Sequence, residues 1–191
     1  MNKWIQWWRR YRLGGKMQYG EDLYLGRNVH ITRPHLVTLD SHVSLDDGFY
    51  CTTQLLVGDY CHISAYVTVI GGKEAGLWLK GFNTVGPHTV MLCASDRFSG
   101  SGLVGVTIPQ EYWDIRDSGT IIVEEFANIG AGTVVMPKTV IGEGAVVGAN
   151  SFVNRDLDPW TVYVGSPVRA IKSRPSKIMK DAARKLRKEL G

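Results

Sequence analysis

The feature of this chain that most constrains its fold is an aliphatic residue at every sixth position. A six-residue period matches neither the 3.6-residue α-helix nor the two-residue alternation of a long strand. It suits short strands joined by tight turns around a three-sided prism, in which three hexads make one coil. The longest run in strict register is Val123, Ile129, Val135, Ile141, Val147 and Val153. The same spacing recurs earlier at Val57, Ile63 and Val69, at Leu79, Val85 and Met91, at Leu25 and Ile31, and at Leu39 and Leu45.

Two segments match the repeat most closely, 129–134 (IGAGTV) and 141–146 (IGEGAV). In each, the aliphatic residue is followed by glycine, which relieves crowding where one coil turns beside the next. These segments resemble the hexapeptide-repeat family of acyltransferases, and the resemblance covers about residues 25–172. It implies an all-β fold, a left-handed parallel β-helix, and a homotrimer.

The repeat divides the chain into parts. We predict the prism over residues 25–172, a short helical segment over 1–24 and a basic C-terminal helix within 173–191. The period fails at about 94–120, an excursion too long for an ordinary turn. Its aromatic residues indicate an ordered loop that packs against a neighbouring subunit and forms one wall of the active site.

The C-terminal segment has the pattern of a short amphipathic helix. Ile178, Ala182 and Leu186 recur at helical spacing among basic residues. We expect these three residues to form the apolar face of the helix.

Composition limits the class of protein. With 191 residues, 44% of them hydrophobic, the chain is long enough for one well-buried core. It has no run of about 18 apolar residues and no signal-peptide pattern, so we expect a cytoplasmic protein. The three cysteines form no CxxC pair, which argues against a disulfide framework or a thiolate zinc site. A net charge of +4 is too mild to indicate nucleic-acid binding.

Near the N-terminus, Trp4, Trp8 and Tyr11 fall on one helical face beside arginines at positions 9, 10 and 12. This composition occurs in interfacial membrane anchors. Packing against the prism or a neighbouring subunit is the simpler interpretation. Residues 4–12 are therefore either a peripheral contact with the inner face of the membrane or a packing segment.

Acyl transfer from a thioester needs a group that takes a proton from the acceptor as it attacks, and histidine is the usual base. The segment 57–64 (VGDYCHIS) looks like one found in sugar acetyltransferases of the family, where a histidine before the inward isoleucine faces the cleft between subunits. The resemblance makes His62 a candidate base or acyl-contacting group. A surface or hydrogen-bonded structural histidine is the alternative.

A second family pattern places the basic histidine at the end of a coil. Residues 90–97 (VMLCASDR) align with it, so Arg97 occupies the histidine position. A guanidinium stays protonated and cannot act as a general base. The neighbouring Asp96 could take that role or orient a base, and a turn-forming aspartate is the alternative.

The segment 94–100 (ASDRFSG) is also similar to a signature of family members tied to surface-polysaccharide synthesis. The resemblance implies a sugar acceptor held beside this loop. The candidate substrate-binding residues are Arg97, Tyr112 and Trp113.

In this family coenzyme A lies in the groove between neighbouring prisms and is held mostly by backbone groups, so small residues at the corners matter. The segment 165–172 (GSPVRAIK) aligns with the closing motif of the family, and basic residues there and nearby could meet phosphates. The candidate cofactor-binding residues are Ala131, Ala149, Asn154, Arg155, Arg169 and Lys172.

The sequence therefore predicts an enzyme that moves an acetyl or other acyl group from acetyl-CoA to a hydroxyl or amine of a sugar or sugar-nucleotide, in surface-polysaccharide synthesis. A γ-type carbonic anhydrase is one alternative, because it shares the prism and His30 and His35 have the spacing of two of its three metal ligands. No third histidine stands one coil away in matching phase. A trimeric CoA-binding scaffold without catalysis is the other alternative, because the end-of-coil histidine is missing.

Overall fold

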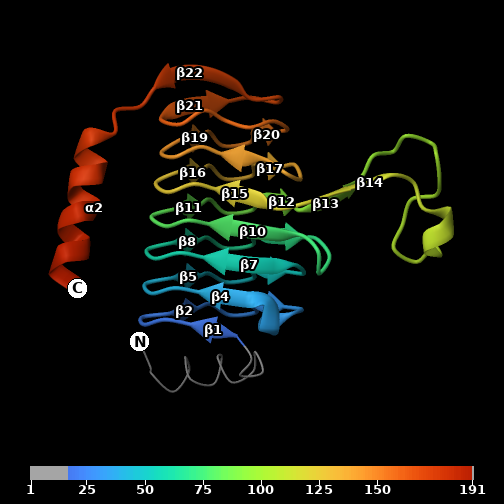
Figure 1. The fold of residues 1–191 in the computed structure, drawn as a ribbon, viewed down its shortest axis with the longest axis horizontal. Helices are drawn as coiled ribbons and strands as arrows, with labels where there is room; N and C mark the ends of the chain where they lie inside the picture. Colours follow the sequence, from blue (N-terminus) through green and yellow to red (C-terminus); the bar gives the residue numbers. More distant parts are fainter. Residues whose placement is uncertain (1–16, 191) are drawn as a thin grey trace.

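The computed structural model describes residues 17–190 and shows a solenoid of short strands stacked in three sheets (Figure 1). Sheet A contains β1 (Gln18–Tyr19), β4 (Val37–Leu39), β7 (Gln54–Val57), β10 (Gly76–Leu79), β15 (Ile121–Val123) and β18 (Val140–Ile141). Sheet B contains β2 (Tyr24–Leu25), β5 (Ser44–Leu45), β8 (His62–Ile63), β11 (Thr84–Val85), β16 (Asn128–Ile129), β19 (Val146–Val147), β21 (Thr161–Val164) and β22 (Arg169–Ser173). Sheet C contains β3 (His30–Ile31), β6 (Tyr50–Cys51), β9 (Thr68–Ile70), β12 (Val90–Leu92), β17 (Val134–Val135) and β20 (Phe152–Val153).

The chain visits sheets A, B and C in turn, and neighbouring strands in each sheet pair in parallel, except that β22 runs antiparallel to β21. The register places aliphatic residues of successive coils directly beside one another, as in Val123 with Ile141 and Val135 with Val153. The prism with three hexads per coil, predicted from the repeat, is confirmed.

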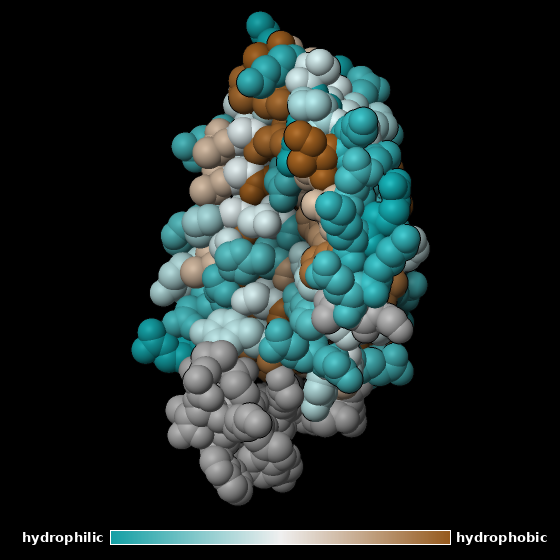
Figure 2. Space-filling view, turned by 90° about the vertical axis from the view of Figure 1, so that its left-hand side faces the viewer, coloured by the Kyte–Doolittle hydropathy of each residue, from teal (hydrophilic) through white to brown (hydrophobic). Residues whose placement is uncertain are grey.

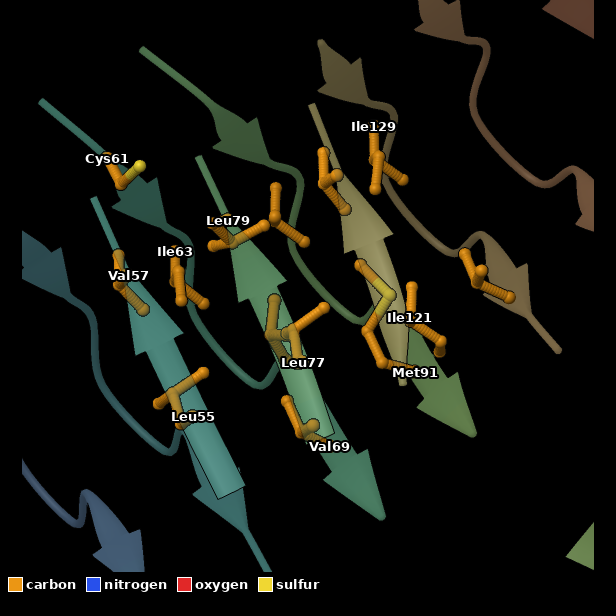
Figure 3. Close-up of a cluster of buried hydrophobic side chains, with 14 of the residues drawn as sticks. Leu55, Val57, Cys61, Ile63, Val69, Leu77, Leu79, Met91, Ile121 and Ile129 are labelled. Atoms are coloured by element: carbon orange, nitrogen blue, oxygen red, sulfur yellow. The ribbon is translucent and has the colours of Figure 1, made fainter. Parts of the chain in front are cut away.

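The core is the ladder of inward aliphatic side chains (Figure 3). All sixteen residues assigned to the repeat are buried, the most exposed being Ile31 at 7%. Burying one such side chain contributes about 1.5–3 kcal/mol, so the repeat contributes a large share of the apolar stabilisation of the solenoid.

The solenoid begins earlier than predicted. Strand β1 pairs with β4 through Gln18 and Thr38, so residues 17–24 are not part of a helical segment. The hexad register extends back from Leu25 to Tyr19, where an exposed tyrosine replaces the aliphatic residue that marks the repeat elsewhere. Residues 1–16, which include the tryptophan and arginine cluster, lie outside the described part of the chain.

Irregular segments collect at the one corner where sheet C leads back to sheet A. The 3₁₀ turn η1 (Pro34–Leu36), the turn at 71–75 and the long excursion all follow sheet C strands. The excursion contains β13 (Ala94–Asp96), η2 (Gln110–Tyr112) and β14 (Arg116–Ser118), with β13 and β14 paired antiparallel. Residues 94–118, called the arm below, project away from the prism (Figure 1).

The turns that lead from sheet A to sheet B form an aromatic corner, defined by His42, Tyr60, Phe82, Phe126 and Trp160. All five have positive φ, and their rings stack between coils with centroids 4.6 to 6.0 Å apart. Helix α2 (Lys177–Leu190) lies along this corner, on the side opposite the arm (Figure 1). Two of its basic side chains each lie on a ring and pair with a glutamate, namely Lys180 with Trp160 and Glu143, and Arg187 with Phe82 and Glu125.

The predicted apolar face of this helix is wrong for two of its three residues. Ile178 is 84% exposed and Ala182 is exposed, Leu186 is half-buried, and Ala183 is the residue buried against the prism. The corner offers glutamates and aromatic rings, so basic side chains bind it better than aliphatic ones do. Viewed from this side, the surface is largely hydrophilic, with apolar atoms gathered toward the C-terminal coils (Figure 2).

Candidate functional site

His62 stands on the outer face of sheet B with two polar residues from the preceding coil. Its Nε2 lies 2.8 Å from Asp46 Oδ2, and Ser44 Oγ donates to the other oxygen, Asp46 Oδ1, at 2.9 Å. The His62 side chain is about half exposed, so it remains accessible to a ligand. An aspartate that binds one ring nitrogen fixes the orientation of an imidazole and leaves Nδ1 available to exchange a proton.

The base of the arm carries two ion pairs between its antiparallel strands. Asp96 Oδ1 accepts a hydrogen bond from Arg116 Nε at 2.9 Å, and these side chains are 18% and 27% exposed. Arg97 donates two hydrogen bonds to Asp117, each 2.8 Å long, and the pairing raises the pKa of Arg97 and lowers that of Asp117. Asp96 is therefore a hairpin residue that faces a cation, not a turn-forming aspartate.

The tip of the arm is folded around the buried carboxylate of Asp114. It accepts hydrogen bonds from the hydroxyls of Ser101 and Ser99 and from the amides of Gly100 and Ile115. These donors hold the pKa of Asp114 well below its usual range. A carboxylate with four donors keeps a segment ordered that has almost no apolar core of its own.

The aromatic residues of the arm have different environments. Trp113 donates from Nε1 to the Ile108 carbonyl, and its ring lies under the Arg116 guanidinium. Tyr112 is 59% exposed and Phe98 is 73% exposed. Trp113 is thus held inside the arm, whereas Tyr112 and Phe98 are available for contacts outside it. Four other large apolar residues of the arm are also exposed: Leu103, Val104, Val106 and Ile115.

The two candidate catalytic residues lie on different sides of the prism. His62 is in β8 of sheet B, which follows the aromatic corner, and Asp96 is in the arm, which leaves the corner after sheet C. Figure 1 shows α2 and the arm on opposite sides of the solenoid. One chain therefore does not bring His62 and Asp96 together.

Small residues occupy one turn position at the third corner, from sheet B to sheet C, in its middle and C-terminal coils. Equivalent turn positions are occupied by Ala65, Pro87, Ala131 and Ala149. In each of these turns the amide of the next residue donates to the carbonyl of the equivalent residue one coil earlier. A Cβ on Gly130 would lie 2.5 Å from the Ala149 nitrogen, so glycine is what lets these coils approach. The corner is therefore narrow in the C-terminal coils, whereas the exposed Tyr66 and His88 rings stack on it in the middle coils.

The polar cofactor candidates lie in the C-terminal coils but not at one corner. Asn154 and Arg155 follow β20 at the corner from sheet C to sheet A, whereas Arg169 and Lys172 lie on β22 of sheet B. Arg155 donates to the Val168 carbonyl at 3.3 Å, which places its guanidinium beside exposed Arg169. Asn154 is exposed after β20, and Lys172 is exposed on β22, opposite Val162. Arg155 and Arg169 are therefore close together, and Lys172 lies further along the edge strand.

Other chemistry has little support in the described residues. No group of three or more histidine, cysteine or acidic side chains there is placed to hold a metal ion, and the His30 ring stacks on Tyr50 instead. Burial raises the pKa of Cys51 to about 11 and those of Cys61 and Cys93 to about 12, which makes them poor nucleophiles. No helix in residues 17–190 is long and apolar enough to cross a membrane.

Three residues of the site were missed from sequence: Asp46, Arg116 and Asp114. Asp46 follows the inward Leu45 and stands one coil before His62, so the coil phase could have indicated their contact. Arg116, the partner of Asp96, and Asp114, the partner of Ser99 and Ser101, lie on the far side of a long loop. The repeat is interrupted there, so it does not predict which residues of the loop pair.

Comparison with known proteins gives the same family by sequence and by structure. The model of the bacterial transferase hexapeptide (six repeats) matches residues 120–155. A dTDP-4-amino-4,6-dideoxy-D-glucose acyltransferase of Escherichia coli is 28% identical and aligns over 86% of each chain. The putative lipopolysaccharide biosynthesis O-acetyl transferase WbbJ of Escherichia coli K12 is 27% identical, over 86% of this chain and 91% of WbbJ.

Among solved structures, AntD, an N-acyltransferase from Bacillus cereus, superimposes closely. A variant of AntD in complex with dTDP-4-amino-4,6-dideoxyglucose and coenzyme A is 34% identical, covers 95% of this chain and 96% of its own, and has a TM-score of 0.84. AntD with dTDP and 3-hydroxybutyryl-CoA is 32% identical over 96% of this chain and 97% of AntD, with a TM-score of 0.83. The chain therefore belongs to the hexapeptide-repeat acyltransferases and is a CoA-dependent enzyme of that family.

Proposed function

We propose that this enzyme transfers an acyl group from coenzyme A to the amine of a nucleotide-activated amino sugar. The observation that carries the proposal is the carboxylate of Asp96 at the base of an ordered arm, in a chain whose relatives include AntD, described as an N-acyltransferase. The similarity to the dTDP-4-amino-4,6-dideoxy-D-glucose acyltransferase and to AntD in complex with dTDP-4-amino-4,6-dideoxyglucose supports a sugar nucleotide as the acceptor. The product belongs to the synthesis of surface polysaccharide.

The chemistry of Asp96 favours nitrogen over oxygen as the acylated atom. A carboxylate is too weak a base to deprotonate a sugar hydroxyl, but it binds an ammonium group and directs the free amine that is in equilibrium with it. As the nitrogen attacks the thioester carbonyl, one N–H proton passes to the carboxylate or to an imidazole. The carbon–sulfur bond breaks, the proton taken from the amine passes from the base to the departing sulfur, and coenzyme A leaves as the thiol. Neither nucleophilic side chain nor covalent enzyme intermediate is required.

We infer that the site is completed by a second copy of the chain, in a homotrimer. His62 and Asp96 lie on opposite sides of one prism, and the arm projects with apolar residues exposed (Figure 1). In a ring of three copies, the arm of each one reaches the prism of the next. Asp96 of one copy then faces His62 of its neighbour, and acetyl-CoA lies along the small-residue corner with its phosphates near Arg155 and Arg169.

In this arrangement His62, held by Asp46, receives the proton that the amine loses, and the exposed Tyr112 and Arg97 flank the acceptor. The enzyme works in the cytoplasm, where acetyl-CoA and nucleotide sugars are available. Residues 4–12, with three arginines and four aromatic residues, have the composition of a peripheral contact with the inner face of the membrane, and packing against the prism or a neighbouring subunit is the alternative.

Mixing two inactive variants tests the composite site. We expect His62→Ala and Asp96→Asn each to lower kcat by roughly a hundredfold or more. When the two are unfolded, mixed in equal amounts and refolded, every mixed trimer has one intact site, so about a quarter of wild-type activity should return. The refolded wild type, and each variant refolded alone, serve as controls. No recovery in trimers shown to be mixed, or a monomer in sedimentation, would refute the composite site.

A further inference from the structure

Asp96 and Arg116 form the more enclosed of the two ion pairs on the hairpin. Both side chains are less than one third exposed, whereas the Arg97 side chain is 52% exposed. An ion pair withdrawn from water holds its geometry better than a surface pair. The single contact, from Arg116 Nε to Asp96 Oδ1, also leaves Asp96 Oδ2 without a hydrogen-bond partner among the described residues.

The guanidinium of Arg116 is fixed on its other side by Trp113. Its central carbon lies 4.3 Å from the centroid of the indole ring, within the range of a cation–π contact. Trp113 is itself immobilised by its hydrogen bond to the Ile108 carbonyl. A Cβ on Gly102 would lie 2.4 Å from the Trp113 backbone, so the loop closes tightly around this residue. The chain of contacts runs from the folded tip of the arm to the carboxylate at its base.

We propose that Arg116, held on the Trp113 ring, is a positioning residue that presents Asp96 Oδ2 to the acceptor amine. Arg116 occupies one oxygen of the carboxylate, and the acceptor binds the other. This inference rests on the proposed function, because Arg116 can position Asp96 for the acceptor only if Asp96 contacts the acceptor. Trp113 then acts through Arg116 and not by direct contact with the sugar.

The arrangement also bears on which acceptors are used. Arg116 supplies a fixed positive charge beside Asp96, so a second cation fits only where Oδ2 faces outward. An amine at the matching position of the sugar satisfies that oxygen, whereas a hydroxyl there donates a weaker, neutral hydrogen bond. Arg116 is therefore expected to affect the use of the acceptor and not the use of acetyl-CoA.

The test compares Arg116→Ala, Arg116→Lys and Asp96→Asn in the full-length enzyme, with acetyl-CoA and dTDP-4-amino-4,6-dideoxyglucose as substrates. We expect Arg116→Ala to lower kcat/KM for the amino sugar roughly tenfold to a hundredfold, because a small displacement of a catalytic group has effects of that size. The KM for acetyl-CoA should stay within about twofold, since that substrate does not meet Asp96. Arg116→Lys keeps the charge and loses the planar fork, so it should recover only part of the activity.

Arg187→Ala is the matched control, because Arg187 also lies on an aromatic ring and pairs with a carboxylate, far from the arm. Its kcat/KM for the amino sugar should match wild type. A normal kcat/KM in Arg116→Ala, with Asp96→Asn impaired, overturns the positioning role and leaves the proposed function intact. Normal activity in Arg116→Ala and in Asp96→Asn overturns both the positioning role and the proposed function. Equal losses of kcat/KM for the amino sugar and for acetyl-CoA, with a lowered melting temperature in both Arg116 variants, indicate a structural role and also overturn the inference.

Discussion

Asp96→Asn is expected to lower kcat for acylation of an amino sugar by roughly a hundredfold or more, because the carboxylate that binds and directs the attacking amine is lost. Asparagine has the shape of aspartate and can still accept a hydrogen bond from Arg116, so the arm should keep its fold. It carries no charge and cannot take a proton at neutral pH, so the acceptor ammonium loses its counter-ion. The change therefore separates the chemistry of the carboxylate from its place in the hairpin.

Steady-state kinetics with varied acceptor and saturating acetyl-CoA measure this effect. Asp181→Asn is a suitable control, because Asp181 also pairs with an arginine, Arg184, but on the exposed helix α2. That variant should retain wild-type kcat. If Asp96→Asn retains it as well, Asp96 has no part in catalysis, and the argument for an amine acceptor loses its main support.

The second large effect is expected on stability, in Gly130→Ala. A methyl group at this position would lie 2.5 Å from the Ala149 nitrogen and 2.7 Å from the Gly148 carbonyl carbon. These are backbone atoms of the next coil, which cannot move aside as a flexible side chain can. Forcing the coils apart should lower the free energy of unfolding by about 1–3 kcal/mol, as overpacking generally does.

Gly72→Ala is the matched control, because a Cβ on Gly72 meets nothing within 4 Å. It should stay within about 1 kcal/mol of wild type, on the stabilising side, since alanine restricts the unfolded chain more than glycine does. Thermal unfolding at equal protein concentration compares the two variants. Equal melting temperatures for Gly130→Ala and wild type would show that the coils at this corner tolerate more separation than their contacts indicate.

The prism could be predicted from sequence because one physical rule repeats in every coil. Each inward position excludes water, so it selects an apolar residue, usually valine, isoleucine or leucine, and the six-residue interval survives even where the turns vary. Tyr19 shows the limit of this rule. In the first described coil the inward position is partly exposed, a tyrosine is tolerated there, and that coil was missed.

The site was predictable only in part, because its residues obey local chemistry and not the repeat. His62 and Asp96 could be singled out by resemblance, but their partners could not. The contact of Asp96 with Arg116 depends on how a loop of about twenty residues closes into a hairpin. The length of that loop does not determine which residues of the two strands pair. The face of α2 was mispredicted for a related reason, since its orientation depends on Glu125 and Glu143 of the prism and not on its own apolar spacing.

The most direct test of the proposed reaction is to incubate the purified enzyme with acetyl-CoA and dTDP-4-amino-4,6-dideoxyglucose and to analyse the sugar nucleotide by mass spectrometry. The corresponding 4-hydroxy sugar nucleotide, in which oxygen replaces the amine, is the control acceptor. We predict that the amino sugar gains one acetyl group on nitrogen, with release of one equivalent of free thiol, while the hydroxy sugar is unchanged. Acetylation of the hydroxy sugar alone, or binding of acetyl-CoA without transfer to either acceptor, would contradict the proposal.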